Sequence, residues 1–242
     1  MKERSRQGRR REAVSAAFKA GVPVLLGYTS IGFAFGLVLV GLGLPWWLAP
    51  TMALFVFAGA AQFMGAALLA AGAGLGEIAL LTLLMNGRHM VYGLSVLDAY
   101  KGAGWRKPYL IFGLTDETYG IVTTIAPPPG SDPIDFYFAL TALNQLWWFL
   151  GCLAGAAIGR AVPFDTSGLE FAMTALFVVL LMEQLRSIRR AEPYLAAAAA
   201  VVIASIAVGP DNLILVATIL SCAFLLALRR RLEPAGGAGS AR

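Results

Sequence analysis

Charged residues are scarce in this chain, and histidine is nearly absent. Only 14% of the 242 residues are charged, whereas 58% are hydrophobic and the mean hydropathy is +0.72. A soluble domain needs a polar surface, so a composition this apolar excludes one. His89 is the single histidine, which excludes a histidine-based metal centre. No Ser-His-Asp arrangement, Walker loop or dinucleotide fingerprint occurs, so we expect neither an enzyme nor a cofactor.

Long apolar runs take the place of charge. A membrane-spanning helix needs about 20 mostly apolar residues, so the length allows roughly seven or eight spans and no separate soluble domain. We expect an all-α polytopic membrane protein with seven or eight transmembrane helices, of which the seventh is short for a span. The apolar runs predict segments at residues 21–42, 50–71, 77–97, 108–126, 134–158, 169–185, 193–208 and 212–228.

Basic residues mark the ends of the chain. The N-terminal tail, residues 1–20, and the C-terminal tail, 229–242, are both basic and flank a single transmembrane domain at 21–228. A basic tail before a span is typical of the cytoplasmic side. We therefore expect a multi-pass protein of the cytoplasmic or inner membrane, with a cytoplasmic N-terminus that contacts anionic lipid and no nucleic-acid partner.

The basic loops conflict with eight simple crossings. Loops 101–107 and 186–190 both favour the cytoplasm, yet three predicted segments, an odd number, separate them. At least one segment must therefore fail to cross, or one basic loop lies on the other side of the membrane.

A weak internal repeat relates the two halves at a spacing of 122 residues. Residues 53–56 recur at 175–178, and Gln62 then matches Gln184. Such a repeat predicts two structural halves with interrupted helices; chance similarity between apolar segments is the alternative. Farther upstream, with a small gap, two pairs of glycines also match: Gly32 with Gly151, and Gly36 with Gly155.

Polar residues inside apolar segments are the strongest functional signal, because each costs about 2.5 to 3.5 kcal/mol on insertion. Asn86-Gly87-Arg88-His89 interrupts the third segment. A helix broken at Gly87 would free backbone groups that can hold the charged ends of a substrate. An interfacial loop, with Arg88 reaching the lipid headgroups, is the alternative.

Two adjacent carboxylates, Asp116 and Glu117, lie in the fourth segment. Neighbouring helical residues point about 100° apart, so both cannot face lipid at low cost. One carboxylate would pair with Arg88, and the other would bind a substrate amine or carry a coupling proton. The alternative is a buried ion pair that only fixes helix packing.

Two amides complete the polar set. Gln62 follows a run of small residues and would act either as a hydrogen-bonding contact between helices or as a substrate contact. Asn144 lies well inside the fifth segment, from which it could reach the interior. The following pair, Trp147 and Trp148, is typical of an interfacial aromatic belt.

Four motifs of this chain occur together in one known family. They are Gly32-Phe33-Ala34-Phe35-Gly36, Phe57-Ala58-Gly59-Ala60-Ala61-Gln62-Phe63, Asn86-Gly87-Arg88-His89-Met90-Val91-Tyr92-Gly93-Leu94-Ser95 and Thr115-Asp116-Glu117-Thr118-Tyr119. With them the chain resembles the AzlC family of branched-chain amino acid permeases, over about Gly21 to Leu228. The resemblance implies export of valine, leucine or isoleucine, together with a small membrane partner of the AzlD type.

A zwitterionic amino acid needs a cation for its carboxylate and an acid for its amine, and Arg88, Asp116 and Glu117 supply these groups. A buried carboxylate can also load and release a proton. We therefore expect a secondary carrier driven by the proton gradient. An uncoupled channel or facilitator and a non-transporting scaffold subunit are the alternatives. Asp116 and Glu117 are the expected proton-coupling residues. The expected substrate-binding residues are Gln62, Asn86, Arg88, His89, Tyr92, Asp116, Glu117, Tyr119 and Asn144.

Overall fold

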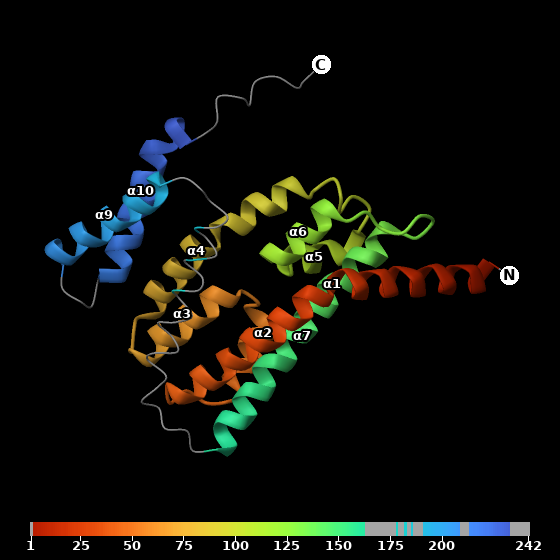
Figure 1. Cartoon of the computed structure of the whole chain (residues 1–242), viewed down its shortest axis with the longest axis horizontal. Helices are drawn as coiled ribbons and strands as arrows, with labels where there is room; N and C mark the ends of the chain where they lie inside the picture. The colour runs from red at the N-terminus through yellow and green to blue at the C-terminus, as the bar shows by residue number, and fades with distance from the viewer. Residues whose placement is uncertain are drawn as a thin grey trace. The chain divides into compact units, whose positions relative to one another are not determined.

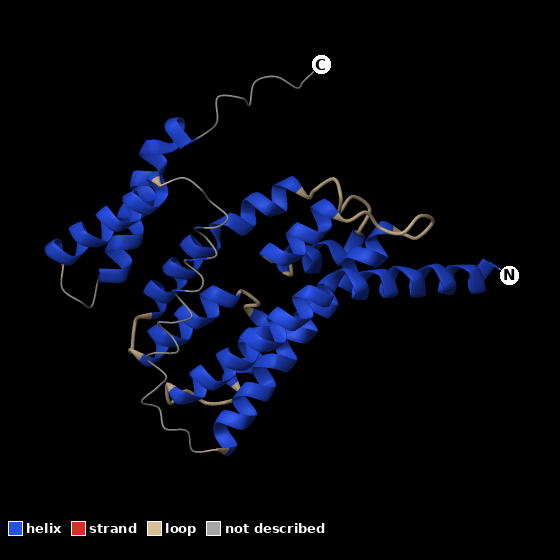
Figure 2. Ribbon diagram, viewed as in Figure 1, coloured by secondary structure: helices blue, strands red, loops and turns tan. Residues whose placement is uncertain are grey.

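The structure is a computed structural model that describes residues 2–162, 191–208 and 213–232, together with positions 178, 182 and 185. The regular structure in these ranges is helical, without a strand, as expected (Figures 1 and 2). The chain divides into two compact units, Met1–Met173 and Thr174–Arg242. The helices are α1 (Lys2–Gly41), α2 (Leu48–Phe55), α3 (Gly59–Ala70), α4 (Leu75–Ser95), η1 (Gly104–Arg106), α5 (Lys107–Phe112), α6 (Asp116–Thr124), α7 (Pro133–Ala161), α9 (Glu192–Ala207) and α10 (Leu213–Leu232).

Two long helices, α1 and α7, lie side by side in the first unit (Figure 1). They run in the same direction, because Gly21 lies against Trp147 early in the pair and Val40 lies against Gly159 late in it. Among the described residues, these two helices are long and apolar enough to cross a membrane. We call the end where α1 and α7 begin the near end, and the end where they finish the far end.

Glycines allow this close approach. A Cβ on Gly36 would overlap the backbone of Cys152 and Ala156, and a Cβ on Gly155 would overlap the carbonyl of Phe33. Small residues at helix crossings let membrane helices pack backbone against backbone. This glycine seam therefore fixes the register of α7 against α1.

The seam contains the glycines that the sequence repeat paired. Gly32 and Gly36 of α1 face the part of α7 that carries Gly151 and Gly155, so the paired positions belong to one interface. The repeat itself stays a prediction, because its second copy, with Gln184, lies almost wholly outside the described residues.

Two of the expected spans are not single helices. The segment at 50–71 is broken at 56–58, between α2 and α3, and the segment at 108–126 is broken at 113–115, between α5 and α6. At 1.5 Å per residue the four pieces are about 9 to 18 Å long, well short of the roughly 30 Å hydrocarbon core of a bilayer. The expectation of an unbroken helix in each of these segments is wrong.

The α2/α3 pair is a hairpin that enters the unit from the far end and returns to it. Before α2, the Trp46 ring lies 5.4 Å from the guanidinium of Arg160, at the end of α7. In the last turn of α2, the Leu54 carbonyl accepts a hydrogen bond from Gln145, in the middle of α7. α3 then leads back toward the far end, where Phe63 packs on a ring of α1 at 5.0 Å between centroids.

The α5/α6 pair is a second hairpin, which enters from the near end. Arg106, directly before α5, pairs with Asp135 in the first turn of α7 at 2.7 Å. Gly113, directly after α5, lies against Thr141, farther along α7. α6 then leads back, because its Val122 is buried in the apolar cluster around the start of α7. The two hairpins thus enter the unit from opposite ends.

Between the hairpins, α4 runs from one end of the unit to the other. It follows α3, and its C-cap residue Val96 is buried at the near end together with Ala13 and Tyr100. The loop at 101–107 therefore lies at the near end, with the N-terminal tail. α4 is continuous through Gly87, so the expected break there is wrong: glycine costs a helix only about 1 kcal/mol, and the backbone hydrogen bonds are kept.

The second unit contains a pair of packed helices, α9 and α10. Ala196, Ala200 and Ala204 recur every four residues along α9 and are buried, which gives this helix one close-packing face. α9 has 16 residues, so the expected seventh segment is indeed short for a span.

Candidate functional site

The tips of the two hairpins meet beside the middle of α7. Phe57 turns the first hairpin with a left-handed backbone, at a φ of +43°. Its ring centroid lies 6.4 Å from that of Phe112, at the tip of the second hairpin. A left-handed conformation is strained for a bulky residue and persists where packing holds it, and here Phe57 is only 4% exposed.

Side chains satisfy backbone groups that the breaks leave free. Gln145 Nε2 donates to the Leu54 carbonyl at 3.0 Å, and the Ala58 amide donates to Gln62 Oε1 at 3.2 Å. At the second break, the Thr115 hydroxyl accepts an amide hydrogen of the first turn of α6 at 3.3 Å. Backbone that is neither helical nor sheet is tolerated inside a membrane protein only with such partners, so these side chains stabilise the breaks.

One face of α7 carries the polar groups between the tips. Thr141, Asn144 and Trp148 recur at three- and four-residue spacing and so share this face. Asn144 Nδ2 donates to the hydroxyl of Thr118 in α6 at 2.9 Å, and Trp148 Nε1 donates to Gln62 Oε1 of α3 at 2.9 Å. This face of α7 therefore connects the returning halves of both hairpins.

α1 adds a tyrosine that reaches both tips. The Tyr28 hydroxyl lies within donating distance of two acceptors, Glu117 Oε2 at 2.5 Å and Thr115 Oγ1 at 2.7 Å. Its ring packs edge-on against Trp148 at 5.5 Å and Phe57 at 6.3 Å between centroids. A single phenol hydrogen serves one acceptor fully at a time, so Glu117 and Thr115 of α6 compete for the hydrogen bond from Tyr28 of α1.

Three buried atoms at this site have no hydrogen-bond partner among the described residues. They are Gln62 Nε2, Thr141 Oγ1 and Asn144 Oδ1, each in a side chain that is fully buried. An unpaired buried polar group costs about 1 to 3 kcal/mol, so groups of this kind mark places where a polar ligand or water binds. Together they offer an N–H donor, a carbonyl acceptor and a hydroxyl.

Of the expected site residues, Gln62, Glu117 and Asn144 come together around the tips. Asp116 is the first residue of α6 and lies at the same tip. Whether these residues contact a substrate stays a prediction, as does proton coupling by the two carboxylates.

A second cluster, between α4 and α6, contains other expected residues. The rings of Tyr92 and Tyr119 stack at 4.4 Å between centroids, and the His89 ring lies 5.8 Å from that of Tyr92. Asn86 is half-buried one turn earlier on α4. The backbone of Arg88 belongs to the same helix, but its side chain lies outside the described part of the chain. Its pairing with a carboxylate stays a prediction.

Several residues of the site were missed from the sequence. Tyr28 lies in the polar stretch 27–30 of an apolar span, a signal that could have identified it. Gln145, the residue after Asn144, was not among the expected site residues, although its side chain donates to the Leu54 carbonyl. Trp147 and Trp148 were expected in an interfacial belt, which is wrong, because they are only 5% and 3% exposed and Trp148 hydrogen-bonds inside the site.

Known proteins share this sequence over most of its length. The AzlC protein family matches residues 23–162, which include both hairpins, α4, α7 and the second half of α1. A membrane protein of Helicobacter pylori is 40% identical over 223 residues, covering 92% of this chain and 97% of that protein. The branched-chain amino acid transport protein AzlC of Bacillus subtilis is 35% identical over 223 residues, covering 92% and 88%. The inner membrane protein YgaZ of Escherichia coli is 30% identical over 184 residues, covering 69% and 73%. No solved structure is significantly similar to the chain.

Proposed function

The chain belongs to the AzlC family of membrane proteins, and on that premise we propose that it exports branched-chain amino acids as a secondary carrier. The similarity to the Bacillus subtilis transport protein supports the substrate class. The observation that carries the proposal is the meeting of two hairpin tips on a polar face of α7. Discontinuous helices that end near the bilayer midplane are the usual construction of substrate sites in secondary transporters.

The tips offer complementary groups to a zwitterion. α3 begins at the first tip, so its opening amides have no intrahelical acceptor and lie at the positive end of the helix dipole, which suits a substrate carboxylate. α6 begins at the second tip with two carboxylates, of which Asp116 suits the ammonium group. Phe57 and Tyr28 supply apolar surface for a branched side chain. Arg88, as a further carboxylate ligand, is part of the same proposal.

We assign proton coupling to Glu117, with Asp116 as the second candidate. When Glu117 is ionised, it is the stronger acceptor for the Tyr28 hydroxyl. When Glu117 is protonated, the phenol hydrogen would pass to Thr115, which lies within reach. Tyr28 also packs on Phe57, at the tip of the first hairpin, and on Trp148, which hydrogen-bonds to Gln62 of α3. A change of hydrogen-bond partner by Tyr28 would therefore transmit the protonation state of Glu117 to both hairpins.

The near end is proposed to be cytoplasmic. It holds two basic segments, the N-terminal tail and the 101–107 loop, as the positive-inside rule requires. If the segment at 108–126 is re-entrant, two crossings remain between that loop and the basic residues at 186–190, which removes the parity conflict. Eight predicted segments less two hairpins give six crossings.

The AzlD-type subunit is part of the proposal through the family alone.

The test is efflux of labelled valine from cells loaded with a valine-containing dipeptide. Cells with this protein and a neighbouring small membrane protein should lose label faster than cells without them. Glu117→Gln and Arg88→Ala should abolish the difference, whereas Ser30→Ala, on the exposed side of α1, should preserve it. Efflux that is indifferent to the protein would contradict the proposal, and efflux without counterflow would indicate an uncoupled pore.

A further inference from the structure

A polar cavity lies at the near end, apart from the hairpin tips. It is half open to solvent and has a volume of about 510 Å³. It is lined by Gln7, Arg9 and Arg10 near the start of α1, by Arg106, and by Asp132, Asp135 and the loop before them at the start of α7. These elements lie far apart in the sequence, and nothing in the proposed transport site uses them. The cavity is therefore a separate feature that needs its own explanation.

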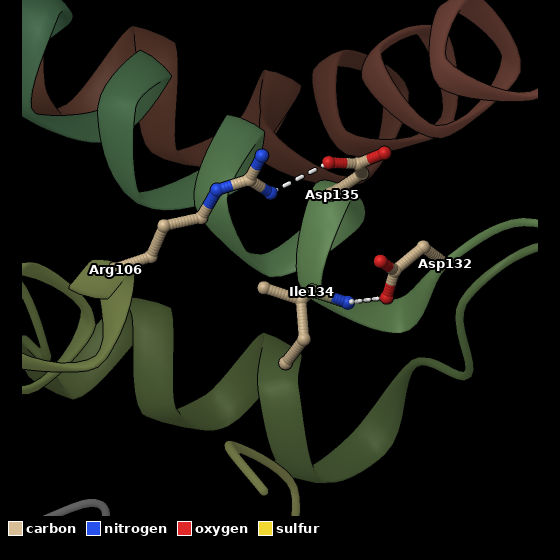
Figure 3. Close-up of polar contacts among 4 residues, drawn as sticks. All are labelled: Arg106, Asp132, Ile134 and Asp135. Atoms are coloured by element: carbon tan, nitrogen blue, oxygen red, sulfur yellow. Dashed lines mark hydrogen bonds and ion pairs between the residues drawn. The ribbon is translucent and has the colours of Figure 1, made fainter. Parts of the chain in front are cut away.

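The acidic groups of the cavity are already engaged. Arg106 donates to Asp135 Oδ1 at 2.7 Å, and Asp132 Oδ1 accepts an amide hydrogen of the first turn of α7 at 2.9 Å (Figure 3). Arg9 and Arg10 have no ion pair among the described residues, and both are exposed. Three cations against two carboxylates leave the cavity with a net charge of +1, which favours an anion over a cation.

An exposed aromatic ring lies beside one of the cavity's cations. Trp105 is 80% exposed, and the Arg106 guanidinium lies 5.8 Å from its indole ring. An exposed tryptophan beside a cation is typical of the membrane–water interface. Arg106 is also held over the ring of Phe138 at 5.3 Å, so it forms a fixed wall rather than a mobile side chain. Two more charged residues, Arg11 and Glu12, follow Arg10, and the first apolar residues of α1 come after them.

We propose that this cavity binds the phosphate headgroup of an anionic phospholipid. Arg9 and Arg10 would contact the phosphate, for which the planar guanidinium is suited, and basic pockets on the cytoplasmic side of membrane proteins bind anionic lipid in this way. The bound lipid would hold the start of α1 against the 130–135 segment, at the base of the α5/α6 hairpin.

The test compares two double variants of the full-length protein by native mass spectrometry with phosphatidylglycerol and with phosphatidylcholine. Arg9→Gln/Arg10→Gln removes the cavity cations, and Arg11→Gln/Lys19→Gln removes the same charge from exposed positions of the same helix that do not line the cavity. Losing one charge-assisted contact to the phosphate from each arginine should weaken phosphatidylglycerol binding on the order of 100-fold. The control pair should weaken it far less, and phosphatidylcholine should bind weakly to all variants.

If the two double variants lose phosphatidylglycerol binding equally, the proposal is overturned, because general attraction between basic residues and the anionic surface would then explain the binding. Inorganic phosphate serves as the second probe. Phosphate that binds with the same dependence on Arg9 and Arg10, while phosphatidylglycerol shows none, would also overturn the lipid assignment. The supporting result is that Arg9→Gln/Arg10→Gln weakens phosphatidylglycerol binding much more than the control pair does. Millimolar phosphate should then displace little phosphatidylglycerol from the unmodified protein.

Discussion

Gly155→Ala should destabilise the protein, although alanine is normally the better helix former. Gly155 lies in α7, where a Cβ would overlap the carbonyl of Phe33 in α1. The overlap is with backbone, so no side-chain rotation relieves it, and the two helices must separate locally. Overpacking of this kind costs about 1 to 3 kcal/mol, and often more where backbone must move. The gain in helix propensity of about 1 kcal/mol offsets only part of it.

Gly27→Ala is the matched control. Gly27 lies in α1, the partner helix of α7. Outside its own stretch of helix, no atom lies within 4 Å of the position that its Cβ would take, so the propensity gain should appear alone. For a chain of this size, 1 kcal/mol corresponds to about 2 to 4 °C, so thermal unfolding in detergent should separate the two variants by several degrees. Gly155→Ala that melts together with Gly27→Ala would refute the close packing of the α1/α7 seam.

Three further predictions concern the hairpins and the carboxylates. Gln145→Leu should lower the free energy of unfolding by about 1 to 3 kcal/mol, because it removes the partner of the Leu54 carbonyl and of the Tyr109 hydroxyl, both of which are only partly buried. Chemical or thermal unfolding measures this. Cysteines introduced by Leu44→Cys and Gly74→Cys should react with a membrane-impermeant thiol reagent from the same side, whereas labelling from opposite sides would mean that the α2/α3 segment crosses. Glu117→Gln should make valine transport insensitive to an imposed pH gradient in proteoliposomes while leaving valine exchange intact. Asp116→Asn should reduce the response to the pH gradient less. A full response to the gradient in both variants would contradict the assignment of the coupling proton.

The all-helical class and the basic near end could be predicted because both follow from composition. Apolar runs identify helices in a membrane protein, and basic loops mark one side. The sequence identified three polar residues of the site, Gln62, Asn144 and Glu117. Polar side chains are costly in lipid, so those within apolar segments are expected to face the protein interior. Each of the three participates in the hydrogen bonds around the hairpin tips.

The helix breaks could not be predicted from hydropathy. Residues 56–58 continue an apolar run, and nothing local requires the left-handed backbone of Phe57, which tertiary packing imposes. The second break had a readable signal, because Thr115 before two acids is a helix N-cap with an acidic first turn. The break expected at Gly87 was wrong because polar side chains on a helix do not disrupt its backbone hydrogen bonds.

The most direct test of the central claim asks whether the substrate binds at the hairpin tips. Thr141 faces the second tip from α7, and its hydroxyl has no partner in the described structure. Thr141→Cys, in a background with Cys152→Ala and Cys222→Ala, places one reactive thiol there, and Ser30→Cys in the same background provides an exposed control. Valine should slow modification of the Thr141→Cys thiol by a small reagent in proteoliposomes, without affecting the control. Unchanged modification under saturating valine, in a variant that still transports it, would contradict the proposed site.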